Sequence, residues 1–258
     1  MVNSVPITIS YGDEPDVMDS ALDVARESGA VLEMEVIQSG EDIYRREIKE
    51  GVMPDIYESL KRTGILIKSA TRTPKEEGYV SVATAICQKL EIDTCLEYYV
   101  SDVTPGVGVI IEKPASPLRI ENIAEVFNLS KALGGQSFCY TIDELGLMLR
   151  QKQEKFPEFT ADYKTAAEAA ASIGNYDIIF TDEASQPVIA AAIKAKIGCR
   201  IFIGNGFRIF EPVENLNAGG KGLILALALA VKYSGQNDAA WEIYKSLSDD
   251  NTQDSAVA

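Results

Sequence analysis

The chain has 258 residues, of which 46% are apolar and 24% are charged, with a formal net charge of −15 and no histidine. A net negative charge of this size argues against nucleic acid as a partner, because its phosphates would be repelled. The absence of histidine excludes serine–histidine–aspartate triads and histidine–zinc sites, which both depend on an imidazole group.

Four cysteines are scattered along the chain without a C-x-x-C pair. This usage is typical of free thiols in a reducing compartment, so we expect a cytoplasmic protein. The longest apolar run, residues 223–231, is far shorter than the roughly 20 residues that a membrane helix needs. No signal-peptide pattern opens the chain. We therefore expect no contact with a membrane.

Strand and helix patterns alternate along the first part of the chain. Apolar and polar residues alternate over residues 7–11, which predicts a strand, and apolar residues recur with helical spacing over residues 17–25. Residues 32–36 alternate with glutamates, which predicts a half-exposed strand near a sheet edge. A polar helix over residues 55–62 is followed by an apolar segment, residues 64–67, that predicts a central strand.

The same alternation continues to the end of the chain and is typical of an α/β protein. Residues after Ser248 lack large apolar side chains apart from Val257, and we expect a disordered tail. The further predicted strands cover residues 107–111, 137–140, 177–181 and 200–203, and the further predicted helices cover residues 120–133, 145–155, 166–173, 188–196, 223–233 and 239–247.

Two glycine-rich segments fail as nucleotide motifs. Gly204-Asn205-Gly206 lacks the third glycine of a dinucleotide fingerprint, and Gly219-Gly220-Lys221-Gly222 lacks the spacing and the hydroxyl residue of a phosphate loop. Glycine clusters of this kind usually mark turns.

The acidic residues near strand ends can be interpreted in two ways, as ligands of a magnesium ion or as helix caps. We favour a cap for Asp182 and Glu183, because caps are common and metal sites are rare. For the same reason we favour a solvated turn and cap for Asp13, Glu14 and Asp16.

The N-terminal stretch resembles the isocitrate and isopropylmalate dehydrogenases. The resemblance lies in ITISYGD, then SGEDIYRREIKEGVMPDIYESLKRTGILIKSATRTP, then GYVSV. It runs nearly continuously from Ile7 to Lys89 and more weakly to about Gly235.

The resemblance implies a two-lobed α/β fold, here truncated, with a central mixed sheet and flanking helices. We expect residues 1–100 and 201–248 to form a large lobe, residues 101–200 a small middle lobe, and residues 249–258 a disordered tail. Active sites in this family form between lobes and across a dimer, so we expect a homodimer. The apolar helix over residues 223–231 would suit either the core or a subunit interface.

The family's chemistry needs a divalent metal (magnesium or manganese), three arginines that clamp the substrate carboxylates, a tyrosine and a lysine that move protons, and NAD or NADP. Arginine offers carboxylates a rigid bidentate fork that neutral side chains cannot replace, and the metal polarises the carbonyl. By the resemblance, the corresponding positions in this chain are Cys87 (first arginine), Leu96–Tyr99 (second), Glu112–Pro114 (third), Ile142 (lysine), positions near Pro187 and Ala191 (metal aspartates), and Glu211–Asn215 (adenosine loop).

Part of the family's ligand cradle is retained. The residual candidates for a substrate or cofactor site are Lys68, Thr73, Tyr79 and Ser81. By the resemblance, Ser81 matches the substrate-binding serine, and Thr73 lies in the loop that meets substrate and cofactor. The competing structural reading makes Ser81 a helix N-cap and Thr73-Pro74 a shaped turn, and we favour it.

The leading hypothesis is a catalytically inactive pseudoenzyme that acts as an interaction or regulatory protein, with no catalytic residue, no metal site and no cofactor. One alternative is a protein that binds a carboxylate or nucleotide, or an NAD(P)-dependent oxidoreductase of altered specificity, which would leave a defined pocket. The other alternative is an acidic decoy for a basic partner, which would leave a continuous negative stripe.

Overall fold

A computed structural model describes residues 4–100, 108–111, 137–142, 146–147, 150, 161–176, 178–182, 184–192, 197–213 and 220–247. Side chains of residues 108–111 are not among those described. The predicted helix at 120–133, most of the helix at 145–155, the third-arginine segment at 112–114 and the tail at 249–258 lie outside these ranges.

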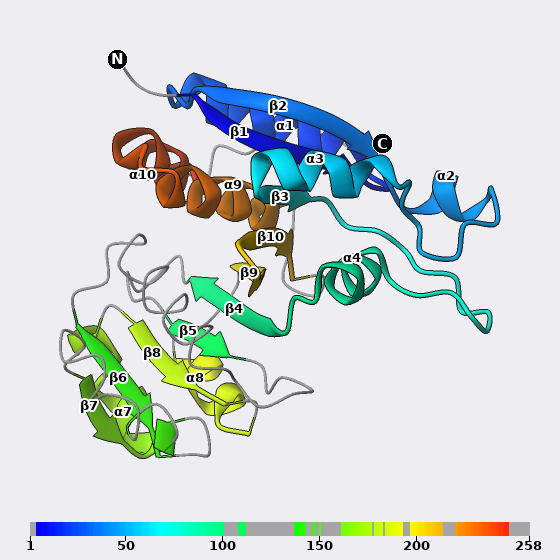
Figure 1. Cartoon of the computed structure of the whole chain (residues 1–258). Coiled ribbons are helices and arrows are strands. Elements are labelled where there is room, and N and C mark those ends of the chain that lie inside the picture. Colours follow the sequence, from blue (N-terminus) through cyan, green and yellow to red (C-terminus); the bar gives the residue numbers. More distant parts are fainter. Residues whose placement is uncertain are drawn as a thin grey trace, which may run out of the picture.

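The described strands form one mixed sheet in the order β2-β1-β3-β10-β9-β4-β5-β8-β6-β7 (Figure 1). Its two ends are parallel, and the centre is antiparallel because β9 pairs antiparallel with both β10 and β4, and β4 pairs antiparallel with β5. The predicted α/β fold with a mixed sheet is therefore confirmed. The strands are β1 (Val5–Tyr11), β2 (Leu32–Gln38), β3 (Ile65–Lys68), β4 (Thr94–Val100), β5 (Gly108–Ile111), β6 (Phe138–Thr141), β7 (Ala161–Lys164), β8 (Ile178–Thr181), β9 (Ile197–Gly204) and β10 (Phe207–Pro212).

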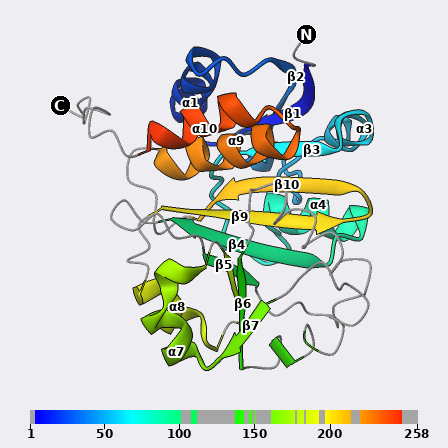
Figure 2. The ribbon, with the colours of Figure 1, turned by 90° about the vertical axis from the view of Figure 1, so that its left-hand side faces the viewer.

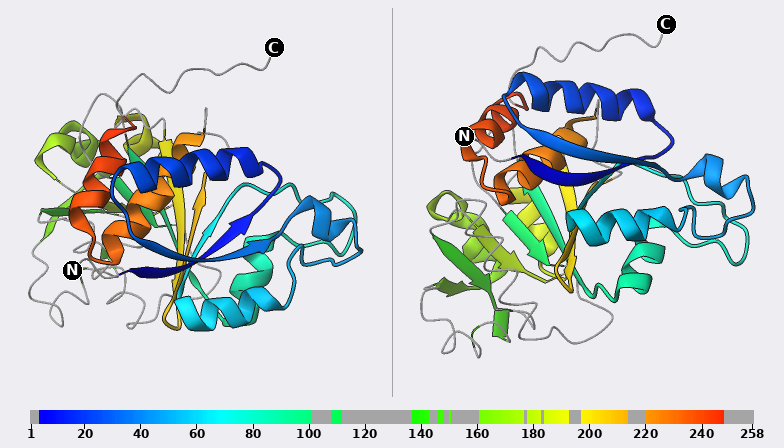
Figure 3. Two further views of the ribbon diagram at one scale, coloured as in Figure 1. Left: turned by 90° about the horizontal axis from the view of Figure 1, so that it is seen from above. Right: turned by 45° about the horizontal axis from the view of Figure 1, so that its top comes forward.

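Helices cover both faces of the β1–β10 part of the sheet (Figures 2 and 3). On one face, α1 (Pro15–Glu27), α9 (Lys221–Tyr233) and α10 (Asn237–Lys245) bury one apolar cluster; on the other, α3 (Asp55–Thr63) and α4 (Val82–Leu90) bury a second. Alternating side chains along each strand feed the two clusters, as the pleat requires. The structure also contains α2 (Glu41–Tyr44), α7 (Ala166–Ala171), a 3-10 helix (Ile173–Asn175) and α8 (Gln186–Ala192).

Helix α9 belongs to the core. All residues from Gly222 to Val231 are buried within the single chain, and the helix packs against α1, α10, β9 and β10. An uninterrupted apolar sequence is expected of a helix that is enclosed on all sides. Among the described helices, none is long and apolar enough to cross a membrane.

The sequence patterns located most of these elements. Strand β2 pairs only with β1 among the described strands and is half exposed, as an edge strand should be, while β3 is fully buried between β1 and β10. Strands β4, β7 and β10 were not predicted. In β4 and β10, Glu97 and Glu211 interrupt the apolar pattern, and both carboxylates are buried.

The segment Gly204-Asn205-Gly206 is the tight turn that joins β9 to β10. Asn205 and Gly206 have φ of 50° and 81°, the left-handed values of a two-residue hairpin turn. The Asn205 amide also donates to the Leu90 and Glu91 carbonyl oxygens at 3.0 and 3.1 Å. This segment is therefore a structural turn at the end of α4, in agreement with its failure as a dinucleotide motif.

Candidate functional site

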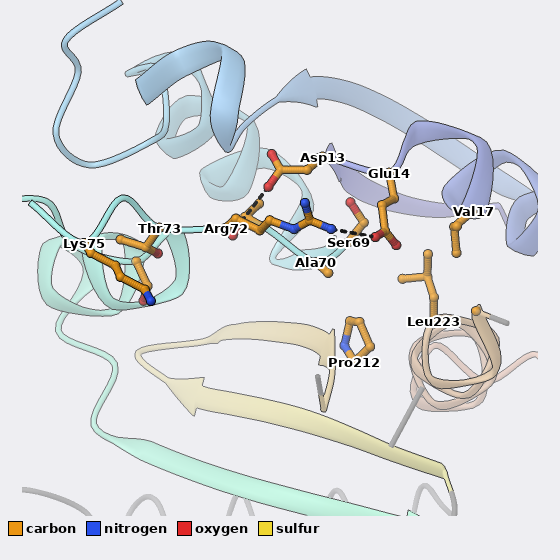
Figure 4. Close-up of a pocket in the computed structure, with 13 residues that line it drawn as sticks. Asp13, Glu14, Val17, Ser69, Ala70, Arg72, Thr73, Lys75, Pro212 and Leu223 are labelled. Atoms are coloured by element: carbon orange, nitrogen blue, oxygen red, sulfur yellow. Dashed lines mark hydrogen bonds and ion pairs between the residues drawn. The ribbon is translucent and has the colours of Figure 1, made fainter. Parts of the chain in front are cut away.

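A pocket of about 760 Å³ opens beyond the carboxyl ends of the parallel strands β1 and β3 (Figure 4). This is the edge where open α/β sheets bind ligands, and the volume suits a small molecule. One side is apolar, formed by Val17, Pro212 and Leu223, and the other is polar and carries both signs of charge. The polar and backbone lining comes from Asp13, Glu14, Ser69, Ala70, Thr71, Arg72, Thr73, Lys75, Ser81 and Gly220.

Asp13 holds the polar wall together. Its Oδ1 accepts from the Glu41 amide at 2.7 Å, and its Oδ2 accepts from the Arg72 amide at 2.5 Å. The Asp13 amide in turn donates to the Ala70 carbonyl at 3.1 Å. The carboxylate thus accepts from the first turn of α2 and fixes the loop after β3, whereas α1, the helix that follows this acidic cluster, has no side-chain cap. The Arg72 side chain lies beside Glu14, with Nη2 to Oε1 at 3.8 Å.

Two of the four predicted site residues, Thr73 and Ser81, line this pocket. Ser81 is also the N-cap of α4, because its Oγ accepts from the Thr84 amide at 3.1 Å. The Thr73 hydroxyl lies 3.5 Å from the Tyr44 hydroxyl. Ser81 therefore has the capping role expected of it, and it also lies on the pocket wall.

We expect Ser81→Ala to lower the free energy of unfolding by about 1 kcal/mol, because the α4 amide loses its cap. Ser81→Asn, which can cap, should restore most of the loss. Urea unfolding followed by circular dichroism measures both. Equal stability of the alanine variant and the wild type would show that the cap contributes nothing.

The other two predicted residues lie elsewhere. Lys68 is 4% exposed, and its Nζ contacts the Ser69 carbonyl at 2.9 Å, Thr71 Oγ1 at 3.3 Å and Glu211 Oε2 at 3.1 Å. Tyr79 packs edge-on against Tyr44, with ring centroids 5.7 Å apart. Neither lines the pocket, so the structure brings together only Thr73 and Ser81 of the predicted set.

Lys68 is the first member of a buried charge network that crosses the sheet. Glu211 on β10 faces Arg200 on β9, and Arg200 faces Glu97 on β4, each in direct register. Arg200 Nη1 lies 3.3 Å from Glu211 Oε1, while its Nε and Nη2 donate to Glu97 Oε1 at 3.0 and 2.7 Å. Both carboxylates are buried, with Glu97 3% exposed and Glu211 7% exposed.

The neighbouring carboxylates stabilise the charged form of Arg200. Burial works against the charge on Arg200, but the carboxylates of Glu97 and Glu211 outweigh it, so the pKa of Arg200 is raised. Because two cations face two carboxylates, the charges within this row are balanced. We call Lys68, Glu211, Arg200 and Glu97 the ion row.

The ion row continues to α8. The Tyr99 hydroxyl donates to Glu97 Oε2, and Gln186 Nε2 donates to the same carboxylate oxygen at 3.2 Å and to the Tyr99 hydroxyl at 3.0 Å. Burial and the bond to Glu97 raise the pKa of Tyr99. Gln186 lies at the start of α8, so this contact ties α8 to β4. This network was not predicted from the sequence. The only sequence feature that pointed to it was the presence of isolated charged residues within apolar strands.

Cys87, at the position of the family's first arginine, is a poor nucleophile. Burial, together with the charge of Glu211, raises the pKa of its thiol to about 12. Only the thiolate reacts readily, and almost none is present near neutral pH.

We therefore expect native Cys87 to react with a disulfide reagent at least about tenfold more slowly than the same residue in denaturant. Peptide mapping by mass spectrometry after timed labelling measures this residue separately from the other three cysteines. Rapid labelling of the native protein at Cys87 would contradict the burial of the thiol and the charge beside it.

The positions of the family's metal aspartates do not fit a metal. Pro187 and Ala191 lie in α8, and within the described residues no group of three acidic or cysteine side chains is placed to hold an ion. Asp182 Oδ1 instead accepts from the Ser185 amide at 2.9 Å in the turn that leads into α8. This supports the cap interpretation for Asp182; Glu183 lies outside the described residues.

The chain has an α/β fold of the isocitrate dehydrogenase type. A beta-decarboxylating dehydrogenase from Thermococcus kodakarensis superposes with a TM-score of 0.67 at 15% identity, over 93% of this chain and 96% of that one. Isocitrate dehydrogenase from Methylococcus capsulatus superposes with a TM-score of 0.65 at 17% identity, over 91% and 87% of the two chains. At these identities the likeness establishes the fold alone.

In sequence, the chain is similar to isocitrate dehydrogenase [NADP] from Rickettsia felis and from Rickettsia conorii. Each is 35% identical over 94 residues, which are 36% of this chain. The match spans about a fifth of the length of those relatives (20%). No protein-family model matches the chain. The predicted resemblance to the isocitrate dehydrogenases is therefore confirmed, as that of a divergent relative.

Proposed function

We propose that the protein is a catalytically inactive, isocitrate/isopropylmalate dehydrogenase-like pseudoenzyme that acts as an interaction or regulatory protein. The observation that carries the proposal is Glu97. By the resemblance, its segment faces the family's second substrate-clamping arginine, yet Glu97 is a buried carboxylate that is already bound by Arg200. A carboxylate that is already paired with Arg200 offers no cation to an anionic substrate, whereas an arginine at that place would bind it.

The rest of the site supports the same conclusion. Lys68, which the sequence retains, is bound to Glu211, and Cys87 offers neither charge nor a reactive thiolate. The residues at the metal positions do not fit an ion, so the proposed function includes no metal-dependent step. Removing a single charge-stabilising group typically costs several kcal/mol of barrier, and the joint loss should leave no useful rate. We propose that no cofactor is required.

The test is turnover by the purified full chain. Isocitrate or 3-isopropylmalate is supplied with magnesium or manganese and with NAD or NADP, and formation of the reduced cofactor is followed by absorbance. An active isocitrate dehydrogenase in the same buffer serves as the positive control. We expect no rate above the rate without protein. A substrate-dependent rate that follows protein concentration would refute the proposal.

The pocket favours a second candidate, a protein that binds a small carboxylate or a nucleotide. Its lining combines apolar Val17, Pro212 and Leu223 with a polar wall that carries Arg72 and Lys75 as well as Asp13 and Glu14, so we propose a ligand with one apolar and one charged end. A thermal shift with such a compound, lost in Thr73→Val but kept in the exposed β2 variant Val36→Ala, would support binding here. No shift with any of a panel of nucleotides and carboxylates would count against it.

We also propose a homodimer and a protein partner. Because α9 is enclosed within the single chain, subunits would have to meet through other surfaces. Sedimentation at several protein concentrations measures the oligomeric state.

A further inference from the structure

The outer face of α10 carries the chain's only tryptophan. The Trp241 side chain is 58% exposed, although the ring is held by stacking on Tyr244, with centroids 5.7 Å apart and planes 18° apart. The helix is already anchored by its opposite face, through Ala239, Ala240 and Ile243. The indole is therefore ordered at the surface without being needed for the packing of α10. Exposed, ordered tryptophan is the residue type that most often dominates binding energy at protein interfaces.

Exposed carboxylates lie near Trp241 in the sequence of α10. Asp238 and Glu242 lie on the exposed face of α10 one turn before Trp241 and directly after it, and Glu242 is paired with Lys245 at 2.6 Å. The neighbouring helix α1 presents an exposed acidic stripe at helical spacing, made of Asp16, Asp19, Asp23 and Glu27.

Helices α1 and α10 lie over the same face of the sheet and contact each other (Figures 2 and 3). The Gln236 side chain connects the start of α10 to Val31, which follows α1. Its Oε1 accepts from the Val31 amide and its Nε2 donates to the Val31 carbonyl, both at 2.9 Å. These two hydrogen bonds hold the start of α10 against the segment that follows α1. On these two helices, Arg26 and Lys245 are each paired with a carboxylate within their own helix.

We propose that the Trp241 face of α10, together with the acidic face of α1, binds a protein segment rich in arginine. A guanidinium stacks favourably on an indole face, and flanking carboxylates add charge-assisted hydrogen bonds. A second copy of this chain would bring the same acidic helices into contact and be repelled, and nucleic acids and anionic membranes would be repelled too. This inference deepens the proposed function as an interaction protein by naming the partner's chemistry.

The test uses a fluorescein-labelled peptide of alternating arginine and serine, with a glutamate–serine peptide of equal length as the control. Because Trp241 is the only tryptophan, its emission reports directly on occupancy of the site. At about 0.15 M salt, where long-range attraction is screened, we expect a saturable change in Trp241 emission with the arginine peptide alone. Peptide anisotropy should show binding weakened at least about tenfold by Trp241→Ala.

Two further variants keep the result interpretable. The double variant Asp238→Asn with Glu242→Gln retains the ring and should also weaken binding, whereas Val36→Ala, at an exposed apolar residue of β2, should not. Melting curves check that each variant is folded. Equal binding by all variants would overturn the proposal, and so would peptide binding without a change in Trp241 emission. The proposal would also fail if Trp241→Ala altered the oligomeric state but not peptide binding. A positive turnover assay would refute the pseudoenzyme and leave the peptide result standing, so the two failures are distinguishable.

Discussion

Glu97→Ala is expected to lower the free energy of unfolding by about 3–5 kcal/mol. The substitution removes the carboxylate that faces Arg200 and leaves this partly buried guanidinium, together with Tyr99 and Gln186, short of an acceptor. Breaking one side of a buried ion pair costs far more than the pair itself contributes, because the remaining charge stays desolvated. Chemical denaturation followed by circular dichroism gives the difference.

Two controls make this result specific. Glu97→Gln keeps the shape and part of the hydrogen bonding, so it should lose less stability than the alanine variant. Glu58→Ala removes an exposed ion pair with Lys61 and should leave stability nearly unchanged. If Glu97→Ala proved as stable as Glu58→Ala, the ion row would not hold the sheet together.

Leu225→Ala is expected to lower the free energy of unfolding by about 2–5 kcal/mol, through lost burial and the cavity it leaves. Leu225 is fully buried in α9, enclosed by elements of its own chain. The loss should therefore be the same at low and high protein concentration. Val36→Ala, which shortens an exposed side chain on β2, should cost much less. A loss of stability that disappears as protein concentration rises would place α9 at a subunit interface instead of the core.

The fold was largely predictable because its patterns are local. Alternation over β1 and β2, helical spacing in α1, and the unbroken apolar sequences of β3 and α9 all follow from which faces are buried. Strands β4 and β10 escaped prediction because each contains a buried glutamate. Their burial depends on partners far away in sequence, on β9 and β3, and no local pattern reveals such pairings.

The candidate site was predictable only in part. Thr73 and Ser81 reach the pocket because both follow from the retained loop and helix start after β3. Lys68 was placed correctly at the end of a strand, but its side chain turns into the interior toward Glu211. That orientation depends on where β10 lies. The pairing of Arg200 with Glu97 could not be predicted, because the two residues are separated by about 100 residues in the sequence.

The cations of the ion row are neutralised by this chain's own carboxylates, and we therefore expect that none of them serves an anionic substrate. Isothermal titration of the purified protein with isocitrate and magnesium tests this expectation most directly. We predict only the heat of dilution, for the wild type and for Ser81→Ala alike. Saturable heat from the wild type that is lost in Ser81→Ala would contradict it, because the cradle would then still bind the substrate of the dehydrogenases that this chain resembles.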